Sequence, residues 1–162
     1  MAPSTDSRAL RTALGRYATG VTIVTCVDAD GAPAGLTCNS FASLSLAPPL
    51  VLWSLRVESP NLAAFIAARH FAVNVLAESQ LALSRRFALP GADRFNEGQW
   101  STGSGGAPLL AGAAAVFECE TVSHQDAGDH RLFIGRVLRF QQTPVPPLVF
   151  QAGRYRGLGG VL

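Results

Sequence analysis

The 162-residue sequence predicts a mainly β protein, an antiparallel barrel with peripheral helices. Two observations carry this prediction. Six or seven segments have the alternating or continuous apolar pattern of strands, whereas two or three have helical spacing. Neighbouring strand segments are joined by turns and not by the helical crossovers of a doubly wound parallel sheet. The length favours a single domain over residues 1–162, with a flexible tail at residues 1–7.

The N-terminal segments predict a helix followed by a hairpin. Apolar residues recur at positions i, i+3, i+4 and i+7 between Arg8 and Thr19, which is the spacing of an amphipathic helix, and Gly20 ends it. The segments "GVTIVTCVD" and "AGLTCNSF" have the pattern of strands, and "DADGA" between them supplies turn residues. We therefore expect a β-hairpin over residues 20–41.

The middle of the chain predicts two strands with a helix between them. "LVLWSLR", directly after a double proline, is a continuous apolar run that is typical of a strand covered on both faces. Ser59 is placed to cap a helix that begins at Pro60 and ends near Ala68. A strand over residues 71–77 follows.

The rest of the chain predicts a second short helix, a loop and three strands. The helix is expected in "SQLALSRRFA". Residues 90–108 are rich in Gly, Asp and Ser, which predicts an irregular surface loop. The strand-like segments are "AAAVFECETVSH", "HRLFIGRVLRFQQ" and "PLVFQAGRYRGL", and "QDAGD" is expected to be the turn between the first two.

Composition excludes several classes of protein. The net charge is +2 and the arginines are scattered, so no nucleic-acid-binding surface is indicated. No apolar run reaches the roughly 18 residues that a membrane span needs, and a soluble protein is expected. The three cysteines form no C-x-x-C pair, which argues against a disulfide scaffold and favours the cytoplasm.

Familiar catalytic motifs do not occur in the sequence. There is no G-x-G-x-x-G between a strand and a helix, no P-loop and no G-x-S-x-G elbow. The three histidines have no Cys or carboxylate at metal-ligand spacing, so no metal site is predicted. The sequence offers neutral hydrogen-bonding groups in place of an acid–base pair.

The densest set of such groups lies in "GLTCNSFASLSLAPPL", residues 35–50. In a strand, Thr37 and Asn39 would point to one face and Ser40 to the other. A ligand at the strand end could bind these side chains and the adjacent backbone N–H groups. Alternatively, the residues hydrogen-bond locally in turns and caps, which is the interpretation we prefer for Ser43 and Ser45. Residue spacing alone leaves both interpretations open for the first three.

Two other features allow a similar pair of interpretations. The "ESPN" segment at residues 58–61 could present free N–H groups to an anion, although most such starts are only helix caps. His130 opens a strand after a Gly-Asp turn, and Tyr155 lies in "GRYRGL". Spacing alone assigns neither residue a role.

The order of several motifs resembles the flavin reductase-like family, the short-chain NAD(P)H:flavin oxidoreductases that serve two-component monooxygenases. The matching motifs are "TGVTIVT", "GLTCNSFASLSLAPPLVLWSL", "SPN", "FAVNVL", "LSRRFA", "RF", "GAPLLAGAAAVFECE" and "GDHRLFIGRV". The resemblance implies an FMN-binding split barrel of antiparallel Greek-key type and a homodimer. It also implies FMN or FAD as the flavin, NADH or NADPH as the hydride donor, and a flavin-dependent monooxygenase as partner.

The resemblance also implies site residues. For the flavin they are Thr37, Asn39, Ser40, Ser54, Leu55, Ser59, Asn61, Arg86 and Phe87. For the nicotinamide nucleotide they are His130, Arg154 and Tyr155, with His130 positioning the nicotinamide. Because hydride passes between two cofactors, the protein needs to orient them rather than supply an acid–base pair. The alternatives are a flavin-binding electron-transfer protein, or a reductase of another acceptor such as a corrinoid or a ferric chelate.

Overall fold

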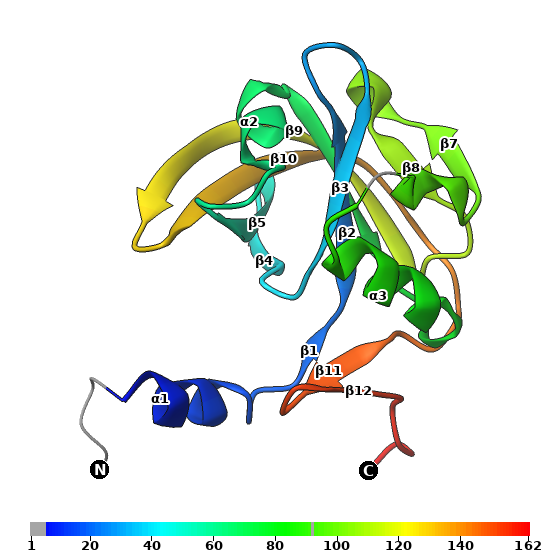
Figure 1. The fold of residues 1–162 in the computed structure, drawn as a ribbon. Coiled ribbons are helices and arrows are strands. Elements are labelled where there is room, and N and C mark those ends of the chain that lie inside the picture. The colour runs from blue at the N-terminus through cyan, green and yellow to red at the C-terminus, as the bar shows by residue number, and fades with distance from the viewer. Residues whose placement is uncertain (1–5, 92) are drawn as a thin grey trace.

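The structure, a computed structural model, describes residues 6–91 and 93–162 as a mainly β protein with antiparallel sheets (Figure 1). The largest sheet has seven strands in the order β3-β2-β6-β9-β10-β5-β4. Its strands are β2 (Thr22–Val27), β3 (Pro33–Cys38), β4 (Ala42–Leu46), β5 (Pro49–Arg56), β6 (His70–Val75), β9 (Ala115–Ala127) and β10 (His130–Gln142). The predicted class and the antiparallel pairing are confirmed.

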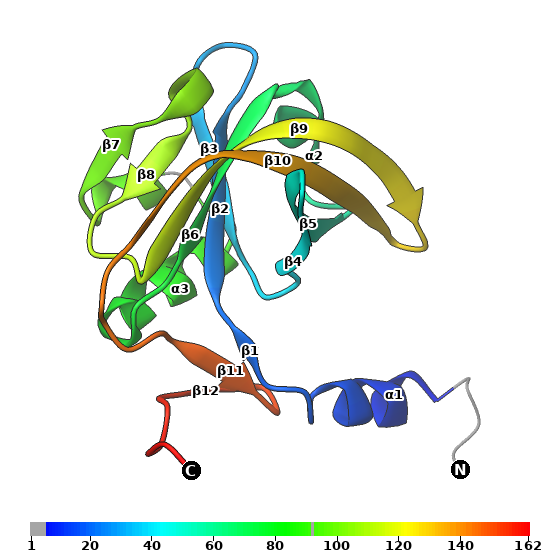
Figure 2. The same cartoon turned by 180° about the vertical axis from the view of Figure 1, so that it is seen from behind.

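Smaller elements surround this sheet (Figures 1 and 2). The remaining strands are β1 (Thr19–Gly20), β7 (Trp100–Thr102), β8 (Pro108–Leu110), β11 (Val149–Gln151) and β12 (Arg154–Arg156). The α-helices are α1 (Ser7–Leu14), α2 (Leu62–Ala67) and α3 (Leu81–Ala88), and short 3-10 turns cover Glu78–Gln80, Arg94–Asn96 and Ser104–Gly106.

Two apolar clusters stabilise the fold. The first gathers Trp53, Phe65, Phe71 and Phe133, and α2 contributes Phe65 to it. The second lies under α3, with Phe87 among its members. Each fully buried aromatic or aliphatic side chain contributes about 1.5–3 kcal/mol of transfer free energy. Buried side chains of the strands and of α2 and α3 therefore hold the sheet and helices together.

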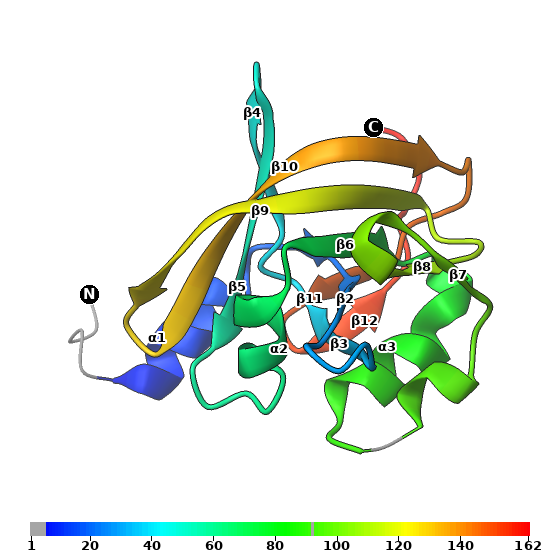
Figure 3. The same cartoon turned by 90° about the horizontal axis from the view of Figure 1, so that it is seen from above.

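Strand β5 differs from its prediction. Val51, Trp53 and Leu55 are buried, but the residues that alternate with them are only half-buried or exposed. The prediction that β5 is covered on both faces is therefore wrong for the described chain. One face of the strand packs on the core, and the other is partly open. The edge strand β4 has no buried residue: its Leu46 is 92% exposed, and the strand projects from the body in Figure 3.

The N-terminal helix is shorter than predicted. It ends at Leu14, because the chain turns at Gly15, and Gly20 lies in a strand paired with β11 instead of ending the helix. The helix stands away from the body and buries none of its residues (Figures 1 and 2). Of the predicted flexible tail, residues 1–5 fall outside the described residues, whereas Asp6 caps the helix that Ser7 begins.

Four further segments differ from the predictions. Helix α2 begins at Leu62, because Ser59 accepts a hydrogen bond from the Asn61 N–H and forms a turn in front of it. The expected loop at 90–108 contains β7, part of β8 and two 3-10 turns, held by aromatic packing. Near the C-terminus the predicted single strand is the hairpin β11–β12, and the β9–β10 turn is only residues 128–129.

Candidate functional site

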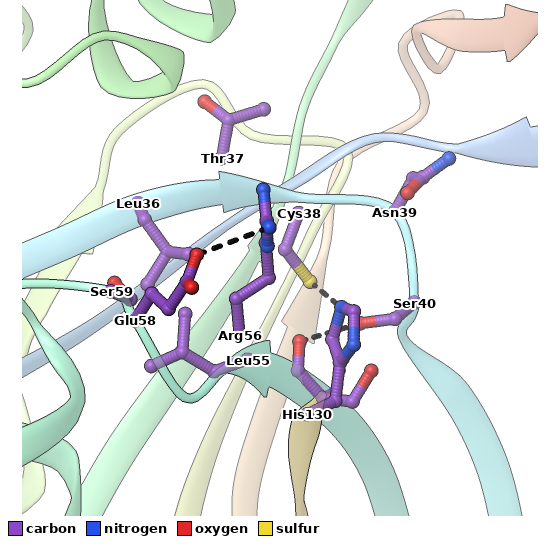
Figure 4. A pocket seen from close by; sticks show the side chains of 11 residues that line it. Leu36, Thr37, Cys38, Asn39, Ser40, Leu55, Arg56, Glu58, Ser59 and His130 are labelled. Carbon is purple, nitrogen blue, oxygen red and sulfur yellow. Dashed lines mark hydrogen bonds and ion pairs between the residues drawn. The ribbon is translucent and has the colours of Figure 1, made fainter. Parts of the chain in front are cut away.

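The main pocket lies where the end of β3, the end of β5 and the start of β10 meet (Figure 4). Its volume of about 430 Å³ is within the usual range for small-molecule sites. Most of the lining residues lie at the ends of β3 and β5. Strand β10 is distant from both in the sequence, but it pairs with β5 in the sheet. Seven predicted site residues line this pocket: Thr37, Asn39, Ser40, Ser54, Leu55, Ser59 and His130.

The residues after Leu36 alternate across β3 as the sequence predicts. Ser40 lies on the main-pocket side, where its Oγ donates to the Ser54 carbonyl (3.0 Å) and accepts from the Ser54 N–H (2.9 Å). Thr37 points the opposite way in Figure 4, and its Oγ1 donates to the Ser84 carbonyl of α3 (2.6 Å). These two hydroxyl groups therefore already have partners within the protein.

Asn39 differs from both of these neighbours. It is exposed, and its side-chain amide makes no hydrogen bond within the described parts of the chain. The interpretation that these residues bond locally in turns and caps is therefore wrong for Thr37 and Ser40, whose partners, Ser84 and Ser54, lie on other elements and fix the strand end. Asn39 lines the main pocket, so its amide is available there to bind a ligand. The hydrogen bonds expected for Ser43 and Ser45 are not found within the described residues, so that prediction is wrong; both side chains lie on β4, which has no buried residue.

A smaller pocket of about 190 Å³ lies on the other side of the same segment. Thr37, Cys38 and Asn39 line both pockets, and Tyr155 borders the smaller one. The Tyr155 hydroxyl accepts a hydrogen bond from Ser84 Oγ (2.9 Å), which holds the C-terminal hairpin against α3. Tyr155 therefore lies next to the predicted flavin residues and does not share a pocket with His130. Arg154 is exposed.

His130 is held by its neighbour in the turn. Its Nδ1 lies 2.7 Å from Asp129 Oδ1, and this hydrogen bond, with the charge of the imidazole, lowers the pKa of the Asp129 carboxyl. An ionised carboxylate can only accept, so Nδ1 carries a proton. The second ring nitrogen, Nε2, is thereby left for a ligand in the main pocket. In the sheet His130 pairs with Arg56 of β5.

Arg86 and Phe87 do not line the main pocket. The Arg86 guanidinium donates to the carbonyls of Asp93 (2.8 Å) and Arg94 (3.2 Å) and pairs with Glu97 at 2.9 Å. Phe87 is 1% exposed and packs against two aromatic rings of the segment that follows α3. Both side chains anchor that segment, and their flavin contacts stay predictions.

Asn61 is the residue before α2 and lines a third cavity, of about 270 Å³, beside Arg94. The helix has only six residues, so the helix-terminus argument for an anion site at "ESPN" carries little weight. Arg56, Glu58 and Cys38 also line the main pocket, although no residue pattern singled them out as ligand-binding. Their adjacency to predicted residues on β3 and β5 was the available signal.

The three cysteines differ in accessibility, which gives a first prediction. Burial, with a smaller effect of Asp28 or Glu118, raises the pKa values of Cys26 and Cys119 to about 12. At pH 8 their thiolate fraction is on the order of 10⁻⁴, and the thiolate is the form that reacts. Iodoacetamide at pH 8 should therefore modify the folded protein at Cys38, as peptide mass spectrometry would show.

FMN or FAD should slow this modification of Cys38, because the thiol lines the main pocket. The control is the Cys38→Ala variant, which should stay unmodified until the protein is unfolded. Modification of Cys26 or Cys119 at the same rate in the native protein would contradict the burial described above.

Fold and site together define a class: an antiparallel β protein with an open pocket at strand ends, lined by neutral polar side chains and a few charged ones. Residues 14–159 match the flavin reductase like domain, so the chain belongs to this family. It is 45% identical over 150 residues to "FMN reductase (NADH) SmoA" of Agrobacterium fabrum, an alignment that covers 93% of this chain and 85% of that protein.

Two other similarities agree with this family. The "Flavin-dependent trigonelline monooxygenase, reductase component" of Acinetobacter baylyi is 45% identical over 148 residues, covering 91% of this chain and 48% of that one. The chain thus spans about half the length of some of the curated relatives it matches. Streptomyces globisporus NADH:FAD oxidoreductase SgcE6, solved in complex with NAD and FAD fragments, superimposes with a TM-score of 0.92 at 37% identity, covering 98% of this chain and 96% of that one.

Proposed function

We propose that this chain is an NAD(P)H:flavin oxidoreductase. It transfers a hydride from NADH or NADPH to FMN or FAD and supplies reduced flavin to a flavin-dependent monooxygenase. The observation that carries the proposal is the convergence of seven predicted flavin and nucleotide residues on one pocket of about 430 Å³. The family match over residues 14–159 and the relatives' names support it.

The residues of the pocket fit a flavin. The Asn39 amide and the Ser54 hydroxyl have no hydrogen-bond partner within the described ranges, and both line the cavity. An amide offers donors and an acceptor together, as the edge of a flavin ring requires. Cavities of this size accept a ring system with a few polar groups that fix its orientation.

When both cofactors are bound, the chemistry they supply is hydride transfer from nicotinamide C4 to flavin N5. The protein's contribution is orientation. The paired hydrogen bonds between Ser40 and Ser54 hold the β3 and β5 walls at a fixed separation. His130, oriented by Asp129, presents Nε2 to the carboxamide or diphosphate of the nucleotide.

We further propose the family's split barrel and a homodimer, with residues 1–162 as one domain. The exposed Leu46, the half-open face of β5 and the unburied apolar side of α1 support a second copy covering these surfaces. Sedimentation equilibrium tests this, and a monomer at micromolar concentration would contradict it. The three free thiols support a cytoplasmic location. No described helix is long and apolar enough to cross a membrane.

A steady-state assay tests the proposed function. NADH or NADPH is mixed with the protein and with excess FMN, FAD or riboflavin in turn. Oxidation of many equivalents of nicotinamide per protein is expected. Consumption of only one equivalent per bound flavin would instead indicate an electron-transfer protein. Turnover that needs an added corrinoid or ferric chelate would indicate another acceptor.

A further inference from the structure

The mouth of the main pocket carries charges that neutralise one another. Arg56 and Glu58 both line the pocket, and Arg56 Nη2 lies 3.3 Å from Glu58 Oε2 (Figure 4). Their side chains are 64% and 80% exposed, so a ligand entering the pocket can reach both. His130, which lines the same pocket, has its own carboxylate partner in Asp129 at 2.7 Å.

This arrangement bears on the choice between NADH and NADPH. The two differ by one phosphate group on the adenosine ribose, which carries nearly two negative charges at neutral pH. A site for that phosphate needs a cation with free donors, for which arginine is the usual choice. A carboxylate at the same place instead accepts from the ribose hydroxyl and repels the phosphate.

In this pocket the charge of the arginine is neutralised by a neighbouring carboxylate. The guanidinium of Arg56 is paired with Glu58, which follows it by two residues on the same strand end. Breaking this ion pair would leave Glu58 beside an incoming dianion. An exposed carboxylate raises the cost of bringing a phosphate nearby, most strongly at low ionic strength.

We propose that Glu58 makes the pocket selective for NADH over NADPH, by holding Arg56 in an ion pair and by repelling the additional phosphate. The inference rests on the proposed reductase function and names the nucleotide that this function uses. Glu58 acts as a specificity-determining residue and takes no part in the hydride step.

The test compares kcat/KM for NADPH and NADH in the native protein and in the Glu58→Gln variant. The native protein should prefer NADH. In Glu58→Gln, the NADPH-to-NADH ratio of kcat/KM should rise about fivefold at low salt, and the rise should shrink as ionic strength increases. Adding Arg56→Gln to Glu58→Gln should return the ratio toward the native value, because the freed guanidinium is then absent.

Glu120→Gln is the matched control. Glu120 pairs with Arg69 at 2.8 Å, does not line the main pocket, and its replacement changes the net charge equally. The ratio should stay at the native value in this variant. A native preference for NADPH, or an unchanged ratio in Glu58→Gln with normal NADH turnover, overturns the inference alone. Absence of nicotinamide oxidation by the native protein with any flavin overturns the proposed function, and the inference with it.

Discussion

His130→Ala should lower kcat/KM for NADH by at least about tenfold while leaving the flavin dissociation constant within about twofold. The imidazole lines the main pocket with Nδ1 held by Asp129, so the variant removes a pre-oriented hydrogen-bonding group. Loss of such a group in a binding site costs about 1.5–3 kcal/mol when its partner is charged, and about 1.4 kcal/mol corresponds to a factor of ten. Steady-state kinetics and flavin titration by fluorescence measure the two quantities.

His124→Ala is the matched control for this prediction. His124 lies on β9, which pairs with the strand β10 that carries His130. It contacts Arg131 and does not line the main pocket. Its replacement should leave both kinetic parameters for NADH close to their native values. Equal effects of the two variants, or an unchanged KM and kcat in His130→Ala, would remove His130 from the nucleotide site.

The strands could be predicted because their apolar pattern is local. Residues 22–26 are all buried, and the β-branched run that predicts β2 is the same run that fills the core. The directions of the side chains after Leu36 could likewise be predicted, because successive side chains of a strand point to opposite faces. The prediction correctly places Thr37 and Ser40 on opposite sides. Local patterns of this kind also led to the polar strand end that forms one wall of the pocket.

The rest of the site depends on contacts that are distant in the sequence. His130 reaches the pocket only because β10 pairs with β5 in a register that places it opposite Arg56. No local pattern specifies that register. Arg86 shows the converse case, because its motif matches the family but its guanidinium is occupied by carbonyls of residues 93 and 94. The rings of Phe95 and Trp100 pack edge to face, which the prediction of an irregular surface loop did not foresee.

The partly open face of β5 shows a further limit of local patterns. The continuous apolar run "LVLWSLR" indicates coverage on both faces, yet only one face packs within the chain. Apolar side chains occur on surfaces that are buried within the chain and also on surfaces that a second copy covers in an oligomer. The disagreement between pattern and burial is therefore itself support for the proposed homodimer.

On the covered face, Trp53→Ala should lower the free energy of unfolding by about 4 kcal/mol. Trp53 is fully buried, with its ring stacked on Phe133 (centroids 4.7 Å apart) and edge-on to Phe65 (4.8 Å). Truncation leaves a cavity that three surrounding rings cannot close. Since small domains have only about 5–15 kcal/mol of stability, urea unfolding should show a large shift of the midpoint.

Trp53→Phe separates packing from hydrogen bonding if Trp53→Ala fails to fold. The indole Nε1 is buried without a hydrogen-bond partner among the described residues, so phenylalanine removes an unsatisfied donor while keeping an aromatic ring. Its cost should be about 1 kcal/mol, because the lost contacts are partly offset by the removed donor. Tyr17→Ala, at a side chain that is 79% exposed, should change stability by less than about 0.5 kcal/mol in the monomer. A loss in Trp53→Phe as large as that expected for Trp53→Ala would contradict this account, in which the smaller ring keeps most of the packing and no hydrogen bond is lost.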